Sequence, residues 1–480
     1  MVHVAVLFGY NGTNFTGLER AKGDKSVESI ILSSLATLTG KSNATESVTM
    51  INISRAATTE EGEHAARQLL SLEIQDENIK IPSPDALNAI LPESIRVFKI
   101  VAPTAEGFSA RRSCEARTYE YLIPTYAFMA PQALAGYDMV HETVSKEDLD
   151  NMYPDADPEV DRSGEGSLFT TLKRLGRSRS RSGRSGSRGR SGTRAGEPES
   201  GIPPPVDLVA NERPSFFSSL RRKNSTRDKD SVAQLLPSSA STLTDSTSNI
   251  QDDIPQFFDP IDLPPRNVDR LRSYRMTEEQ LDMVRTIVAI FRGTHNWHNY
   301  VPGADADDQR CFMRIINIES GSPEIHNGME WIRIKAQSKA MARFQFRRMI
   351  ALLILVIRTN TPRSLIANSF GVNKIEIPDA PAGSLIFHQP AYNVYNDSVG
   401  PKYAVNFDDE KAKVEGFRKT QIHDRVYVEE REELHFEQWL RNIDRHAFLY
   451  KYYLNSRGLI TAQNSFLRDG ANEENLYNIR

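Results

Sequence analysis

The residues whose type and spacing best suit chemistry lie in one short acidic turn. Residues 60–63 read Glu-Glu-Gly-Glu, and they lie between two alternating apolar runs, "SVTMINIS" (47–54) and "RQLLSLEI" (67–74). Both runs predict strands, so the turn would be anchored at each end. A carboxylate held in this way can serve as a nucleophile, a proton donor or acceptor, or an electrostatic partner. The alternative is an ordinary solvated loop.

The elements that must position this turn form two halves of similar pattern. In the first half, residues 26–40 predict a helix that begins at Ser26 and stops at Gly40. In the second half, residues 277–292 predict a helix with a capping box, and residues 344–358 predict an apolar core helix. Helices on one face of a mostly antiparallel sheet, occurring twice, indicate the α+β class with two pseudo-duplicated subdomains. Further strands are predicted at residues 3–10, 95–102, 118–128, 310–320 and 330–338.

Composition separates the two halves. Residues 173–194 carry nine Lys and Arg and no acidic residue, and Pro- and Ser-rich stretches follow. Such a tract buries too little apolar surface to fold, so it predicts a disordered insertion. It would be a non-specific RNA tether, or else a solvated linker or localisation signal. We therefore expect an N-terminal subdomain at 1–130, a connector at 131–159, the insertion at 160–268, a C-terminal subdomain at 269–400 and a helical appendage at 401–480.

The composition of the whole chain narrows the class of protein. Its 480 residues carry a net charge of −4, from 59 basic and 63 acidic residues, which neither demands nor excludes a nucleic-acid partner. Cys114 and Cys311 lack the paired spacing of a zinc site and are expected to be small buried hydrophobic residues. The longest apolar run, residues 350–357, is too short to span a bilayer. With no signal-peptide pattern at the start, we expect an intracellular protein without a membrane partner, in the nucleus or cytoplasm, with an organelle as the alternative.

Six segments in consistent order resemble TruA-type pseudouridine synthases, and their details are most similar to the eukaryotic tRNA-modifying branch. Together they cover most of residues 1–400 apart from the insertion. Each motif is weak alone, but the six in order indicate the pseudouridine synthase fold, in which the two subdomains surround a central RNA-binding cleft. The segments are "LFGYNGTNFTGLER" (7–20), "ALNAILPESIRV" (86–97), "GFSARRSCEARTYEYLIPTYAF" (107–128), "FRGTHNWHNYV" (291–301), "QFRRMIALLI" (345–354) and "APAGSLIF" (380–387).

The resemblance bears directly on the acidic turn. Residues 57–65 fall on the family's catalytic loop, A-R-T-D-x-G-V-H/S-A, so Glu60 stands at the position of the catalytic aspartate. Thr58 replaces the arginine of that loop, and Glu63 replaces a small apolar residue. Glu61 is the alternative for the aspartate position. Glu60 is one methylene longer than aspartate, which moves its carboxylate by about 1.5 Å.

The resemblance also implies the partners of that carboxylate and the reaction. Tyr119 would form a wall beside the uracil base, and Arg347 would be a buried arginine that pairs with the catalytic carboxylate. The implied function is isomerisation of uridine to pseudouridine in tRNA, which requires no cofactor and no metal. The alternative is a catalytically inactive RNA-binding or ribonucleoprotein protein that keeps the fold, because the aspartate and arginine are replaced.

The implied ligand is tRNA or another structured RNA. His295 and His298 have H-x-x-H spacing, but no cysteine or carboxylate cluster lies nearby in sequence, so a hydrogen-bonded loop near RNA is expected in place of a metal site. The residues expected to contact RNA are Tyr10, Asn11, Arg20, Arg55, Thr59, His64, Arg111, Arg117, His295, Asn296 and His298.

Overall fold

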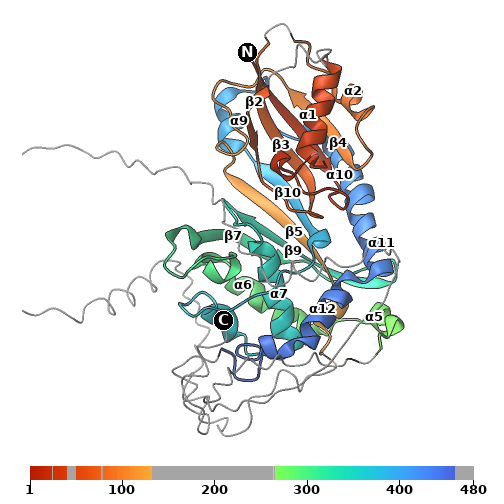
Figure 1. The fold of residues 1–480 in the computed structure, drawn as a ribbon, viewed down its shortest axis with the longest axis vertical. Helices are drawn as coiled ribbons and strands as arrows, with labels where there is room; N and C mark the ends of the chain where they lie inside the picture. The colour runs from red at the N-terminus through yellow and green to blue at the C-terminus, as the bar shows by residue number, and fades with distance from the viewer. Residues whose placement is uncertain (24, 40–49, 77–78, 132–262, 264, 460–480) are drawn as a thin grey trace, which may run out of the picture. The chain divides into compact units, whose positions relative to one another are not determined.

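The computed structural model describes residues 1–23, 25–39, 50–76, 79–131, 263 and 265–459 (Figure 1). Almost all of the predicted insertion at 160–268, and the connector at 131–159 apart from residue 131, lie outside the described residues. The last residues assigned to the insertion are described, and at Val268 they enter a helix.

Strands from both halves join one mixed sheet of ten strands. Its order is β4-β1-β3-β10-β5-β9-β7-β6, with β2 paired to β3 and β8 paired to β9. The strands are β1 (Val2–Tyr10), β2 (Met50–Arg55), β3 (His64–Ile74), β4 (Ile95–Val101), β5 (Ala116–Pro124), β6 (Gly293–Asn296), β7 (Phe312–Ser320), β8 (Glu324–His326), β9 (Met329–Ser338) and β10 (Leu385–Ala391).

One strand joins the halves. β10 lies between β3 and β5, parallel to β3 and antiparallel to β5, and every other pair among these strands is antiparallel. Residues 380–387 were identified in the sequence as a family motif, and no strand was predicted there. The α+β class is confirmed, whereas the duplication of two subdomains is not: a continuous sheet crosses from one half to the other.

The helices begin where local sequence signals place them. Ser26 caps α1, and Thr277 and Gln280 form the predicted capping box at the start of α6. The helices are α1 (Val27–Leu38), α2 (Pro84–Asn88), α5 (Val268–Ser273), α6 (Glu278–Ile290), α7 (Gln345–Arg358), α8 (Ser364–Asn368), α9 (Asn393–Val399), α10 (Lys411–Phe417), α11 (Asp424–Glu433) and α12 (His435–Arg445).

Helical segments cover both faces of the sheet at β5. The rings of Tyr119 and Tyr121 lie 6.3 and 6.1 Å from the ring of Phe346 in α7. Glu120 alternates to the opposite face, where its carboxylate lies 3.0 Å from Nε2 of His423. His423 ends a π-helical turn, Arg418–His423, between α10 and α11. The prediction that helices lie on one face of the sheet is therefore wrong at this strand.

The C-terminal helices are part of the main body. In Figure 1, α10 and α11 run beside the sheet from the N-terminal strands toward α12. The ring of Phe417 in α10 lies 5.8 Å from that of Phe98 in β4, and Lys99 donates to Asp409 across 2.7 Å. The segment expected as an appendage therefore packs on the first half of the chain, and it supplies the groups around Glu120.

Two further sequence expectations concern single features. Cys114 and Cys311 are both buried and unpaired, as predicted. Among the described residues, α7 and all other helices fall short of the length and apolar character that a membrane crossing needs.

Candidate catalytic loop

The acidic turn is fixed by its own last glutamate. The N–H of Glu63 donates to the carbonyl of Glu60 (3.1 Å), and the N–H of Glu60 donates to Oε2 of Glu63 (2.8 Å). Gly62 has a φ of 79°, a conformation that favours glycine, and a Cβ there would lie 3.5 Å from Cβ of Ala382. Backbone and side chain thus close the turn together, so the direction of the Glu60 side chain is set by the turn.

His64 ties the turn to two other loops. Its Nδ1 accepts from the N–H of Gly12 (2.8 Å), so Nε2 carries the proton and donates to the carbonyl of Gly383 (2.8 Å). Burial lowers the pKa of His64 to about 4, more than a hydrogen bond to Gly383 raises it, so the ring is neutral near pH 7. A Cβ on Gly12 would lie 1.9 Å from the Glu63 carbonyl oxygen, so only glycine allows this approach.

Two of the three carboxylates of the turn, those of Glu60 and Glu63, face different arginines. Oε2 of Glu60 lies 2.7 Å from Nη2 of Arg343, and Oε1 of Glu63 lies 3.7 Å from Nη1 of Arg347. Arg347 thus forms an ion pair with Glu63, and its predicted pairing with Glu60 stays a prediction. Nε of Arg347 also donates to the Ala380 carbonyl (2.7 Å), which holds the guanidinium from its other side.

Both arginines belong to the start of α7. Phe344 precedes the helix with a left-handed φ of 64°, and its ring lies 4.8 Å from the guanidinium carbon of Arg343 and 5.5 Å from that of Arg347. The N-terminus of α7, where the helix dipole is positive, adds to the positive charge of these two arginines. The turn therefore presents its carboxylates to a strongly electropositive helix end.

Tyr119 lies one strand away from the loop. Ala65 of β3 pairs with Phe387 of β10, which pairs with Tyr119 of β5, so the three residues form one rung of the sheet. The Tyr119 side chain is 9% exposed, and its ring lies 5.4 Å from that of Phe387. Burial raises the pKa of Tyr119 to about 12, so the hydroxyl stays protonated at neutral pH.

Several residues expected to contact RNA are instead internal supports. Tyr10 is fully buried, and its hydroxyl shares a 2.6 Å hydrogen bond with the buried Thr59. Asn11 is buried and donates to the Gln421 carbonyl (2.6 Å). His64 is fully buried as well. These four side chains have almost no surface to offer RNA, so the expectation that they contact it is corrected: they hold the loop.

Arg55, which was expected to contact RNA, pairs with two glutamates. Arg55 donates from Nε and Nη2 to the two oxygens of Glu28 (2.9 and 3.0 Å), and Glu28 is buried in α1. Its Nη1 also lies 3.3 Å from Glu19. This double pairing fastens α1 to β2, and the exposed Arg20 contributes its backbone N–H to the same carboxylate.

A second group of basic residues borders the loop. Arg117 donates from Nε to the Ala56 carbonyl (2.6 Å), directly before the loop, and from Nη2 to the Arg111 carbonyl (3.1 Å). Its Nη1 donates to the carbonyl of Lys339. The side chains of Arg111, Lys339 and Arg343 are exposed. Arg117 thus gathers three backbone segments, and two of these carry exposed cations.

The H-x-x-H motif lies in the packing of the second half. The ring of His295 stacks on Phe370 at 4.1 Å, and the side chain of Asn296 donates to the Ala306 carbonyl (2.7 Å). His298 is fully buried, and burial lowers its pKa. These contacts fix a loop against α8 and β7, so buried His298 has no surface for RNA.

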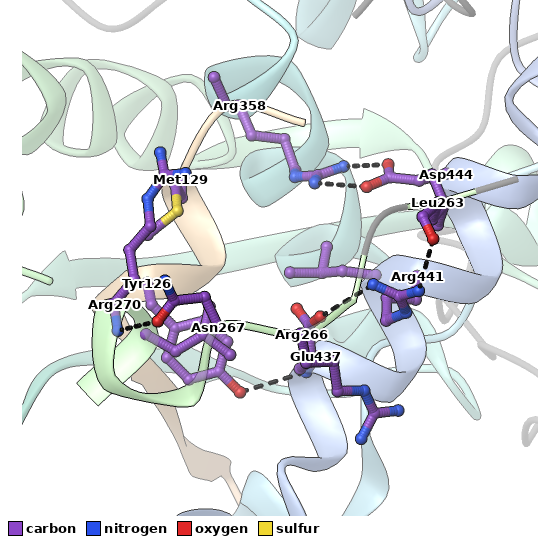
Figure 2. Close-up of a pocket in the computed structure, with 13 residues that line it drawn as sticks. Tyr126, Met129, Leu263, Arg266, Asn267, Arg270, Arg358, Glu437, Arg441 and Asp444 are labelled. Carbon is purple, nitrogen blue, oxygen red and sulfur yellow. Dashed lines mark hydrogen bonds and ion pairs between the residues drawn. The ribbon is translucent and has the colours of Figure 1, made fainter. Parts of the chain in front are cut away.

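A hollow between helices lies away from the loop. It is found where α5, α12 and the C-terminal end of α7 meet, and its lining includes Tyr126, Arg270 and Arg441 (Figure 2). On one wall, Arg358 donates to both oxygens of Asp444 at 2.6 and 2.9 Å. None of the three predicted catalytic residues lines this hollow. The chemistry of the loop, not the depth of a pocket, therefore identifies the candidate site.

Two residues of the site were not predicted. Arg343 was not singled out, because it precedes α7 and the left-handed conformation of Phe344, which directs it toward the turn, is not visible in the sequence. Glu63 was noted only as a departure from the family. Its position directly before a buried histidine and strand was the available signal that its carboxylate would be internal.

Comparison with known proteins gives relatives for nearly the whole chain. No protein-family model matches it. It is 26% identical over 453 residues to tRNA pseudouridine synthase 1 of Yarrowia lipolytica, covering 92% of this chain and 74% of that protein. It is 26% identical over 492 residues to tRNA pseudouridine synthase 1 of Schizosaccharomyces pombe, covering 95% and 86%. With tRNA pseudouridine synthase 2 of the same yeast it shares 24% identity over 471 residues, covering 93% and 90%. These similarities confirm the resemblance read from the motifs.

Proposed function

We propose that this chain, a relative of the eukaryotic tRNA pseudouridine synthases 1, isomerises uridine to pseudouridine in tRNA at the loop of residues 58–64. The observation that carries the proposal is the turn itself, which aims the Glu60 carboxylate at the arginine-bearing start of α7. The similarity of nearly the whole chain to tRNA pseudouridine synthases supports the same conclusion.

The reaction is an isomerisation, so its atoms balance within the substrate. The bond from C1′ to N1 breaks, the uracil turns, and a bond from C1′ to C5 forms; C5 loses a proton and N1 gains one. In our proposal the Glu60 carboxylate stabilises the positive charge that develops at C1′, or bonds to C1′ for a time, and helps to move the proton. Because the longer side chain of glutamate must reach the same atom, the fixed turn has to compensate for its extra freedom.

The remaining roles concern the base and its surroundings. The target uridine must leave its stack, which costs roughly a few kcal/mol, and contacts of the base with a wall and with cations offset this cost. We assign the wall to Tyr119, whose hydroxyl is neutral; because its side chain is 9% exposed, its ring has to be uncovered when the base enters. Arg347, fixed by Glu63 and the Ala380 carbonyl, supplies positive charge behind the carboxylates.

The RNA would lie along the basic border of the loop. Arg111, Lys339 and Arg343 are exposed there, and phosphate groups bind such side chains in a salt-dependent way. The two halves meet where β10 pairs with β3, and we place the centre of the RNA-binding surface there. We also propose that the two halves derive from a duplicated unit. Since tRNA is made and used inside cells, we propose an intracellular location, nuclear or cytoplasmic.

The test measures pseudouridine in tRNA transcripts incubated with purified protein. The wild type should form pseudouridine, and Glu60→Ala should lower the rate by at least about 10²-fold, because the group beside C1′ is lost. Glu61→Gln, in the exposed middle of the same turn, decides between the two carboxylates: loss of activity there would assign the chemistry to Glu61.

One observation favours a second candidate. Glu63 forms an ion pair with Arg347, the arginine that the resemblance assigned to the catalytic carboxylate. This favours an RNA-binding protein without turnover. In that case wild-type protein binds tRNA in the same assay and leaves no pseudouridine, which would contradict the first proposal.

A further inference from the structure

Arg347 is held by a residue whose role the resemblance did not assign. Its guanidinium lies 3.7 Å from Oε1 of Glu63, a side chain that is 4% exposed, and it donates to the Ala380 carbonyl. The electrostatic attraction between opposite charges is strong where water is excluded. Glu63 and Ala380 together therefore decide where this guanidinium points.

The same glutamate also decides where Glu60 points. Oε2 of Glu63 accepts the N–H of Glu60, so one side chain fixes both a backbone atom of the candidate catalytic residue and the nearby cation. Moving Glu63 toward another partner would open the turn. The Glu63 carboxylate therefore holds the Glu60 N–H and Arg347 at the same time, so a change at Glu63 affects both.

Glu60 forms its ion pair with a more exposed arginine than Glu63 does. Arg343 is 58% exposed, whereas Arg347 is 13% exposed, and the two guanidiniums approach the ring of Phe344. An exposed ion pair is weak and screened by salt, and a phosphate group competes well for its guanidinium. We therefore expect RNA at the border to compete with Glu60 for Arg343.

We propose that Glu63 is a positioning residue for the proposed isomerisation: it holds Arg347 and the turn of Glu60 in place, while Glu60 forms an ion pair with Arg343, for which an RNA phosphate competes. The proposal rests on the proposed function. It implies that residues 60 and 63 are interdependent. With Glu63 in place, shortening Glu60 to aspartate moves the carboxylate away from Arg343 while Arg347 stays held by Glu63. Without the carboxylate at 63, Arg347 loses that ion pair and becomes available to an aspartate at position 60.

The experiment is a double-mutant cycle with single-turnover rates on tRNA transcripts. Glu60→Asp and Glu63→Val should each lower the rate at least tenfold, and Glu60→Asp combined with Glu63→Val should exceed Glu60→Asp alone by at least tenfold. Additive losses in the double variant would overturn the proposal, because a merely structural residue gives no such rescue. Asp444→Asn is the matched control: it breaks another buried Arg–carboxylate pair of α7 and, although it lowers stability, it should leave the rate per folded molecule unchanged.

A second variant, Glu63→Gln, tests the role of Glu63 if Glu63→Val does not fold. Glu63→Gln keeps the shape and can still accept the Glu60 N–H, but it removes the charge that holds Arg347, so kcat should fall at least tenfold while KM stays within about twofold. An unchanged kcat would contradict the role of Glu63. If the wild-type protein makes no pseudouridine, the proposed function fails. The role of Glu63 is then decided by comparing the double variant with Glu60→Asp. Equal activity, or no activity in either variant, overturns the inference.

Discussion

The two ends of α7 each hold an arginine against a buried carboxylate, but with different geometry. At the C-terminal end, Arg358 donates to both oxygens of Asp444 at 2.6 and 2.9 Å (Figure 2). At the N-terminal end, Arg347 lies 3.7 Å from one oxygen of Glu63, whose other oxygen accepts a backbone N–H. One pair is a closed bidentate contact, and the other is an open contact shared with a turn.

The difference separates a structural contact from a functional one. A bidentate pair satisfies both charges in one fixed geometry, and it joins α7 to α12. The open pair uses one oxygen of Glu63 at 3.7 Å, and it places Arg347 beside the loop at which we propose that the substrate binds. The same residue types on the same helix therefore serve stability at one end and, in our proposal, reactivity at the other.

The largest effect is expected at the closed pair. Asp444→Asn leaves the 5% exposed Arg358 without its carboxylate and should lower the free energy of unfolding by about 3–5 kcal/mol, because the remaining charge is buried. Chemical denaturation measures the loss. A change below about 1 kcal/mol would mean that the contact is not the structural member of the comparison.

A smaller effect on stability is expected from lowering the pH, because His64 follows Glu63 of the open pair and is buried in its neutral form. Its folded pKa of about 4 lies below its ordinary value of 6.5, so the unfolded chain binds the proton first and stability falls as pH falls from 6.5 toward 4. By pH 5 the loss is about 2 kcal/mol. His64→Gln should remove this part of the pH dependence in denaturation at pH 7.5 and 5, whereas His435→Gln, at an exposed position, should retain it. Equal pH dependence in wild type and His64→Gln would contradict a neutral buried His64.

The smallest effect is expected at the exposed ion pair. Arg343→Gln should change the free energy of unfolding by less than about 1 kcal/mol, since Arg343 is 58% exposed. The affinity for tRNA should fall and its salt dependence should weaken, which filter binding at two salt concentrations measures. A loss of stability comparable to that of Asp444→Asn would show that this pair is structural and cannot be withdrawn by RNA.

Local signals in the sequence predicted most of the elements but not how they join. The caps of α1 and α6, the alternating strands and the apolar α7 depend on neighbours within a few residues, and all are found. β10 was missed because its seven residues carry little pattern of their own, and its partners, β3 and β5, are more than 250 positions away. Long-range pairing of this kind made the single sheet unpredictable from local periodicity.

The candidate site divides in the same way. The acidic turn, Tyr119 and Arg347 were identified from sequence, and the structure brings the turn and Arg347 together. The internal roles of Tyr10, Thr59 and His64 could not be predicted, because a polar residue in a loop motif looks the same whether it faces RNA or a neighbouring loop. Only burial and hydrogen-bond partners distinguish the two.

The sequence by itself therefore determined the class of fold, the relatives and the position of the loop, because residue order and local pattern carry that information. The tertiary structure decided which carboxylate meets which arginine. That choice depends on a few ångströms between residues nearly 300 positions apart, where Glu63 reaches Arg347 and Glu60 reaches Arg343. Electrostatic pairing depends on distance and burial, and neither is written in the spacing of residues along the chain.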